Sequence, residues 1–230
     1  MGGRGASSGA GRGKSGGGGS LYNGLRVEGK AADQQRADMI VKGMKDVLND
    51  FGFADELTGV VFNEKGVLMG GEAQASMNGF GQLTISNKYL REPIKNSNGF
   101  HASDTDIGTG THEAGHAVVN SLLKHSVKIN PDEPNKTDAR TRLERATARK
   151  TGKLEKEIIK EAKKRYGSNP AISRYGSKNV IEKVAEAVSD VYTNKSKSNP
   201  YSKTIVGVMK DIKNGKFNPT ITVTKRQMGI

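Results

Sequence analysis

The 230-residue sequence contains no cysteine. This absence excludes disulfide bonds, thiolate catalysis and zinc sites built on cysteine. Long apolar runs are also missing: no stretch approaches the roughly 20 residues that a membrane-spanning helix needs. Met1 is followed by Gly, Arg and Ser rather than by an apolar segment, so no secretory signal peptide is expected. We therefore expect a soluble protein without a membrane partner, in the cytoplasm or associated with a virion.

The apolar fraction is low, 33%, and the mean hydropathy is −0.63. Much of this deficit comes from residues 1–20, of which ten are Gly. Such a segment cannot bury enough surface to fold. We expect a flexible Gly-rich linker or tail over residues 1–25, followed by one domain over residues 26–230.

The formal net charge is +13. Much of it lies between Lys136 and Arg165, where twelve Lys or Arg stand against five Asp or Glu, a net of +7. Basic stretches attract nucleic acids and other anionic partners. Aromatic residues do not alternate with these charges, so stacking on single-stranded bases is not expected. A solvated helix face is the favoured interpretation, with nucleic acid kept as a weakly supported partner.

Hydrophobic periodicity predicts how the chain is organised. A helix is expected over 31–51, then a hairpin from 59–62 and 66–69, and a strand over 82–90. The polar stretch 91–110 indicates a long loop. Further helices are expected over 111–124, 137–165, 178–193 and from Asn199-Pro200 to about Gly215, with a terminal strand over 219–224. A helix, then several strands, then several helices is typical of an α+β domain.

The chemistry is concentrated in His112-Glu113-Ala114-Gly115-His116. Residues four apart lie on the same helix face, where two neutral imidazoles can bind one Zn²⁺. Glu113 lies beside them and can take a proton from zinc-bound water, whose pKa the metal lowers. Gly115 is unfavourable inside a helix, so its presence indicates a close packing partner.

A catalytic zinc site needs a third protein ligand and one open position. Leu122 stands where a third histidine would follow in the extended form of this motif, and His125 falls on the far side of the helix. His101 is in the polar loop without a supporting pattern. The better source is an acidic row at helical spacing in a later helix, formed by Glu182, Glu186 and Asp190.

These motifs resemble the gluzincins, zinc peptidases in which a Glu from a second helix completes the His-Glu-x-x-His site. Two registers stay open. Glu186-Ala187-Val188-Ser189-Asp190 is similar to a segment of thermolysin-like enzymes, which implies Glu186 as ligand and Asp190 as its partner. The segment from Tyr175 to Glu186 resembles the zinc domain of anthrax lethal factor and related toxin domains more fully.

This second, preferred register implies that Glu182 binds zinc, that Glu186 orients a ligating histidine and that Tyr175 stabilises the oxyanion. It also implies a zincin-like fold, with a small mixed sheet packed on the helix that carries the motif. The strand over 82–90 would then line the substrate cleft. The layout of a Gly-rich leader and such a domain is also similar to peptidase or toxin modules of phage head proteins, so the domain is expected to belong to a larger polypeptide.

Two functions are therefore carried forward. The first is a zinc-dependent metalloendopeptidase that hydrolyses protein or peptide substrates with Glu113 as general base. The second is a non-enzymatic basic module, associated with phage particles or nucleic acid, whose metal site is degenerate.

Overall fold

The computed structural model describes residues 21–64, 74–92, 97–133 and 136–230. Its strands are β1 (Arg26–Glu28), β2 (Gly59–Asn63), β3 (Ala75–Met77) and β4 (Gln82–Ser86). Its α-helices are α1 (Gln34–Asp50), α2 (Asn87–Arg91), α3 (Asp106–His125), α4 (Asp138–Lys150), α5 (Lys153–Tyr166), α6 (Val180–Asn194), α7 (Pro200–Lys213) and α8 (Lys225–Met228). The α+β class expected from the sequence is confirmed.

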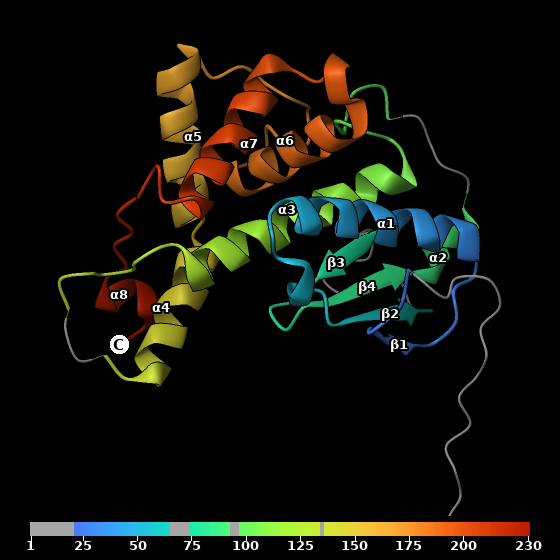
Figure 1. Ribbon diagram of the computed structural model, residues 1–230, viewed down its shortest axis with the longest axis horizontal. Coiled ribbons are helices and arrows are strands. Elements are labelled where there is room, and N and C mark those ends of the chain that lie inside the picture. The colour runs from blue at the N-terminus through green and yellow to red at the C-terminus, as the bar shows by residue number, and fades with distance from the viewer. Residues whose placement is uncertain (1–20, 65–73, 93–96, 134–135) are drawn as a thin grey trace, which may run out of the picture.

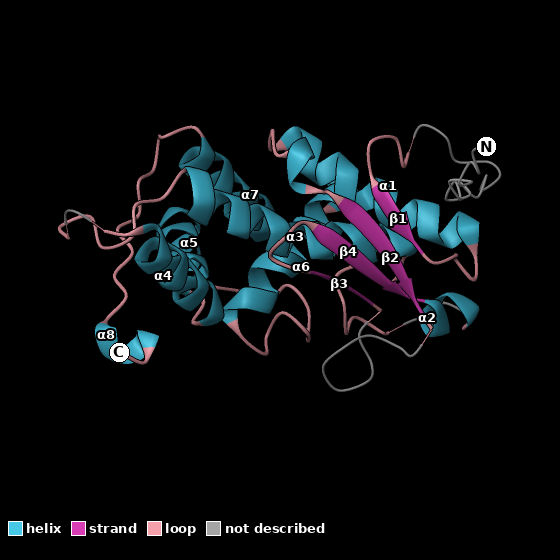
Figure 2. Cartoon of the chain, turned by 90° about the horizontal axis from the view of Figure 1, so that it is seen from below, coloured by secondary structure: helices cyan, strands magenta, loops and turns pink. Residues whose placement is uncertain are grey.

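The four described strands form one sheet in the order β1-β2-β4-β3. β1, β2 and β4 are parallel, whereas β3 runs antiparallel to β4 and forms one edge. The sheet occupies one end of the molecule, with α4, α5 and α8 at the other end (Figure 2). The sheet is mixed, as expected, although β2 pairs with parallel strands on both sides and not in a simple hairpin.

Helix α3 lies at the centre of the fold. It packs against α1 and β3 toward the sheet, and against α6 toward the C-terminal helices. Figure 1 shows α1 and α3 side by side above the strands, with α5, α6 and α7 on the other side of α3. A single apolar core runs through both halves and includes Ile40, Leu83, Leu122 and Val188, all fully buried.

Glycines let these helices approach closely. A Cβ atom on Gly110 of α3 would lie only 1.9 Å from the carbonyl oxygen of Ile40, and one on Gly43 of α1 would lie 2.5 Å from that of Ile107. Any larger residue at these positions would force α1 and α3 apart, because the opposing atoms belong to the backbone. Gly115 makes the corresponding approach to α6, which confirms the close partner expected there.

Helix α3 begins at Asp106, so the prediction of a loop up to residue 110 is wrong. Thr105 caps the helix by accepting a hydrogen bond from the amide of Gly108. Gly108 and Gly110 have low helix propensity, but their close contacts in the folded chain favour the helical conformation.

The prediction of one charged helix over 137–165 is also wrong, because this segment forms two helices, α4 and α5, separated at Gly152. This glycine has φ of +59°, a left-handed conformation that ends one helix and starts the next. Thr151 closes α4 by donating its hydroxyl to the carbonyl of Thr147. The basic residues are thus distributed over two helices.

The strand predictions are partly wrong. β4 ends at Ser86, which caps α2, so residues 87–90 are helical. β2 pairs in parallel on both sides, with β1 and β4, and the second half of the expected hairpin, 66–69, lies outside the described residues. The expected strand over 219–224 is reduced to one bridge between Ile129 and Ile221.

Residues 1–20 of the expected linker lie outside the described residues. Leu21, Tyr22 and Leu25 pack against the core, and the carbonyl of Leu21 accepts a hydrogen bond from Lys45. In the part of the chain that the structure describes, no helix has the length and apolar character needed to cross a membrane.

Candidate metal centre

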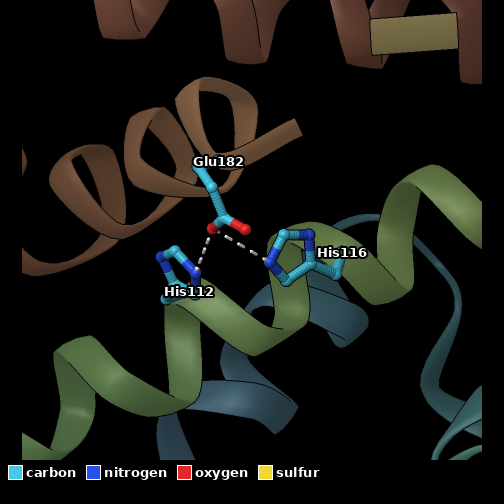
Figure 3. A group of neighbouring side chains, drawn as sticks. All are labelled: His112, His116 and Glu182. Atoms are coloured by element: carbon cyan, nitrogen blue, oxygen red, sulfur yellow. Dashed lines mark ion pairs between the residues drawn. The ribbon is translucent and has the colours of Figure 1, made fainter. Parts of the chain in front are cut away.

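Helix α3 presents His112 and His116 on one face, one turn apart. Their ring centroids are 5.0 Å apart and their planes are nearly perpendicular, at 82°. Both rings face α6, whose first turn carries Glu182 (Figure 3). Asn179 caps that turn by accepting a hydrogen bond from the amide of Glu182, so the position of this carboxylate is set by the start of the helix.

The Glu182 carboxylate converges on both imidazoles. Its Oε2 atom lies 3.2 Å from Nε2 of His112 and 3.6 Å from Nε2 of His116. One ligand atom from each of the three residues fits within 4.8 Å of the others. The same Oε2 atom is buried and has no partner that meets hydrogen-bond geometry in the described part of the chain. The three residues can therefore hold a metal ion.

Glu186, one turn further along α6, contacts the opposite side of His112. Its Oε1 atom lies 2.8 Å from Nδ1 of His112, and its Oε2 atom accepts a hydrogen bond from the amide of Ala102. Only 1% of Glu186 is exposed. Burial opposes its ionisation, but hydrogen bonds from His101 and His112 outweigh burial and lower the pKa of Glu186. Its charge fixes His112 with Nε2 facing Glu182.

The protonation of His112 follows from these two carboxylates. Burial alone would lower its pKa, but the nearby Glu182 and Glu186 carboxylates raise the pKa of His112 to about 10. Interaction with the two imidazoles likewise lowers the pKa of Glu182, against the effect of burial. A metal ion that binds here must therefore displace a proton from His112.

The third member of the acidic row, Asp190, has different contacts. It accepts hydrogen bonds from the side chain of Asn194 and from the backbone amide of Asn199. Because Asn199 caps α7, these bonds fix the connection between α6 and α7. The row 182–186–190 thus serves two purposes: its first two carboxylates reach the histidines, and Asp190 organises the next helix.

Glu113 lies beside the cluster and faces the sheet. The backbone of Met77, in β3, lies near its carboxylate and favours the charged form. Burial raises the pKa of Glu113 above its usual value, while His116 and His112 oppose that shift. A carboxylate in this setting is a better proton acceptor than one in water.

The strand nearest to the site is β3 and not β4. Sequence reasoning assigned the cleft to residues 82–90, but β4 is enclosed between β2 and β3. Backbone bonds join Gln74 to Ser86 and Asn78 to Gln82 across β3 and β4. Because an antiparallel ladder alternates, the peptide groups of Ala75 and Met77 point away from β4, toward the site.

Tyr175 lies in the loop before α6. Its ring centroid lies 5.7 Å from that of His112, and its hydroxyl group feels the charge of the Glu182 carboxylate. Burial, followed by the charges of Glu182 and Glu113, raises the pKa of Tyr175 to about 12. The phenol is therefore protonated at neutral pH and can donate a hydrogen bond at the site.

His101 is a neighbour that sequence reasoning did not single out. Its ring lies 4.8 Å from the ring of Tyr175, and its Nδ1 atom is 3.5 Å from Glu186. No spacing pattern connects a loop residue to helices this far along the chain, so only the fold identifies it. His125, by contrast, pairs with Glu56 on the far side of α3, as expected.

A cavity of about 390 Å³ opens beside these residues. His112, Glu113, His101 and Tyr175 all line it, together with Ala75 of the edge strand. His112 and Glu113 are therefore accessible to a ligand larger than water.

Comparisons with protein-family models, with curated proteins and with solved structures find no significant match to this chain. The function must therefore be argued from the site itself.

Proposed function

We propose that the protein is a zinc-dependent metallopeptidase with a zincin-like fold of the gluzincin type. The observation that carries the proposal is the convergence of Glu182 Oε2 on the Nε2 atoms of His112 and His116, with Glu113 adjacent. Two ligands bound to zinc at about 2.1 Å with tetrahedral angles are roughly 3.4 Å apart. The distances of 3.2 and 3.6 Å lie on either side of that value.

The donor set also favours zinc. Two imidazoles and one carboxylate form the ligand set of many catalytic zinc sites, which keep a fourth position open. In this proposal Glu182 is the third ligand, since its free oxygen faces both Nε2 atoms. Glu186 is the positioning residue, since it contacts Nδ1 of His112 and holds that ring by hydrogen bonding.

When bound, zinc supplies a Lewis acid that lowers the pKa of water and polarises a carbonyl group. Glu113 accepts the proton of the attacking water and later delivers it to the leaving amine. The phenol of Tyr175 donates a hydrogen bond to the carbonyl oxygen as negative charge develops there.

The edge strand supports a peptide as substrate. The peptide groups of Ala75 and Met77 point away from β4, and an extended peptide can pair with such an edge as an added strand. Met77 also contacts Glu113, so a chain bound along β3 would pass close to the general base.

The alternative, a basic module that binds nucleic acid, has weaker support. Four of the twelve cations of the run 136–165 form ion pairs within the described part of the chain: Lys136 and Arg140 with Glu144, Lys160 with Glu157, and Arg165 with Glu161 and Asp211. Paired charges contribute little to phosphate binding, because counterion release depends on cations free to meet phosphates.

Cleavage of a mixed peptide substrate by the zinc-loaded chain tests the proposal. We expect cleavage that a chelator abolishes and that Glu113→Gln reduces by at least about 100-fold, since a general base contributes that much. Glu157→Gln, on the outer face of α5, is the control and should leave the rate unchanged. Equal activity in Glu113→Gln would remove the assigned base, and a wild type inactive with zinc would contradict the peptidase.

A further inference from the structure

Three aromatic side chains lie together in the lining of the cavity beside the metal centre. They are Phe100, His101 and Tyr175, and we call them the aromatic rim. The ring of Phe100 lies 4.9 Å from His101 and 5.6 Å from Tyr175, and His101 lies 4.8 Å from Tyr175. All three line the same cavity as His112 and Glu113.

Backbone hydrogen bonds fix the aromatic rim. The amide of Tyr175 donates to the carbonyl of Phe100, and the amide of Arg174 donates to Gly99. The loop before α3 and the loop before α6 are therefore tied together. The amide of Lys178 donates in turn to the carbonyl of Tyr175. This bond closes a turn that places Lys178 next to the aromatic rim.

The ammonium group of Lys178 lies over this rim. Its Nζ atom is 4.3 Å from the centroid of Tyr175 and 5.2 Å from that of Phe100, and Lys178 lines the cavity with His112 and Glu113. Ring faces attract the cation while removing part of its hydration. A cation with less water interacts more strongly with a carboxylate.

Lys178 also has no internal anion to neutralise it. Among the described residues, no carboxylate oxygen lies within 4.0 Å of its Nζ atom. The two carboxylates that line the same cavity have other partners: Glu186 contacts His112 and Ala102, and Glu113 contacts Met77.

The neighbouring cation, Arg174, differs in this respect. Its guanidinium donates hydrogen bonds to the carbonyls of Ser97 and Asn98, so it holds the loop before α3. Of the two cations at the rim, Lys178 is thus the one left for a ligand.

We propose that Lys178 recognises a carboxylate of the peptide within two residues of the scissile bond. The substrate class is therefore peptides that carry Asp or Glu near the cleaved bond, or a chain end whose terminal carboxylate lies there. This inference rests on the proposed peptidase function, because it assigns a specificity to that same site. The limit of two residues follows from Tyr175, because its ring lies 5.7 Å from the ring of His112 while the Lys178 ammonium group lies over it.

The test is digestion of a proteome-derived peptide mixture, with cleaved bonds mapped by mass spectrometry. For the wild type we expect Asp and Glu to be enriched about fivefold within two residues of the cleaved bonds, the size expected of one partly exposed ion pair. Lys178→Glu should replace this enrichment with one for Lys and Arg. Lys164→Glu makes the same charge change at the exposed end of α5 and should retain the wild-type preference.

The same digest separates the two sources of the carboxylate. Internal acidic residues are the source if the preference survives when the peptide C-termini are amidated. A terminal carboxylate is the source if cleavage occurs mainly within two residues of free C-termini and is lost when these C-termini are amidated. Cleavage without any acidic preference, or a preference that Lys178→Glu leaves unchanged, would overturn the inference.

Binding provides a measurement that does not require turnover. The zinc-loaded Glu113→Gln chain is titrated with a capped peptide of alternating Ala and Glu and with its Ala and Gln counterpart. We expect the Glu peptide to bind about fivefold more tightly, and the difference to disappear when Lys178→Glu is added. Equal affinities would overturn the inference even if the wild type cleaved neither peptide, an outcome that would separately reject the peptidase function.

Discussion

Gly115 of α3 and Ala185 of α6 touch at the point where the two halves of the metal centre meet. A Cβ atom on Gly115 would lie 2.8 Å from the Cα atom of Ala185. The residues on either side of this contact are the three that can hold a metal: His112 and His116 on α3, and Glu182 on α6. The separation between the two helices therefore sets the separation between the ligands.

Gly115→Ala should destabilise the fold and weaken metal binding together. The added methyl group meets backbone, so α3 and α6 must move apart, at a cost of about 1–3 kcal/mol. The better helix propensity of Ala recovers roughly 1 kcal/mol of this. Urea unfolding and zinc titration measure both effects.

Gly207→Ala is the matched control for that change. Gly207 is also within a helix, α7, but a Cβ atom there would meet nothing within 4 Å. We expect up to about 1 kcal/mol of stabilisation with no change in zinc affinity. If Gly115→Ala behaved like Gly207→Ala, the close contact would not be setting the ligand geometry.

Tyr175→Phe should slow turnover while leaving the metal in place. Loss of one hydrogen-bond donor to a developing oxyanion lowers kcat by about 100-fold. The ring contacts with Phe100 and His101 remain, so KM and zinc content should change little. Tyr166→Phe, on the far end of α5, is the control. Full activity in Tyr175→Phe would show that the hydroxyl is not needed for the reaction.

Glu144 should make stability depend on pH. Only 1% of it is exposed, and Asn130, Lys136 and Arg140 all donate to its carboxylate. Burial opposes ionisation, but hydrogen bonds from Lys136 and Arg140 outweigh it and hold the pKa of Glu144 below its usual value. This stability is present above the unfolded-state pKa near 4.3. It is lost as pH falls from there through the folded-state pKa.

Glu144→Gln should remove that pH dependence and cost about 2 kcal/mol at neutral pH, since it leaves buried donors without a charged acceptor. Urea unfolding between about pH 7 and pH 3 gives the measurement. Glu157→Gln breaks only the pair with the exposed Lys160, so its effect should stay below roughly 1 kcal/mol. An identical pH profile for wild type and Glu144→Gln would refute the assignment.

The amphipathic helices α1 and α7 could be predicted from local pattern, because their apolar residues recur with a period that burial enforces. Met44 and Leu48 of α1, or Val208 and Ile212 of α7, illustrate this, since all are at most 1% exposed. The start of α3 could not be predicted, because Gly108 and Gly110 are weak helix formers, and Gly110 is favoured only by its close approach to Ile40, 70 residues earlier in the chain.

The sheet was the least predictable part. β1 and β3 have three residues each, too few to show an alternating pattern. The parallel pairs join residues far apart along the chain: Arg26 of β1 pairs with Gly59 of β2, and Gly59 pairs with Gln82 of β4. Parallel pairing of this kind is set by the packing of whole elements, which no local window of sequence contains.

For the site, spacing alone places His112 and His116 on one face, and it places Glu182 and Glu186 one turn apart. Which carboxylate meets the open side of the imidazoles depends on how α6 crosses α3, and that depends on the contact at Gly115. His101 is out of reach of spacing arguments altogether, because a loop folded against Glu186 brings it to the site.

The central claim, that His112, His116 and Glu182 hold zinc while Glu186 orients His112, is tested most directly by metal analysis. Wild type, Glu182→Gln and Glu186→Gln are purified without chelator, and zinc is quantified by mass spectrometry and by titration. We predict equimolar zinc in the wild type, little in Glu182→Gln, and zinc bound about 10–100-fold more weakly in Glu186→Gln. A wild type without zinc, or a loss confined to Glu186→Gln, would contradict the claim.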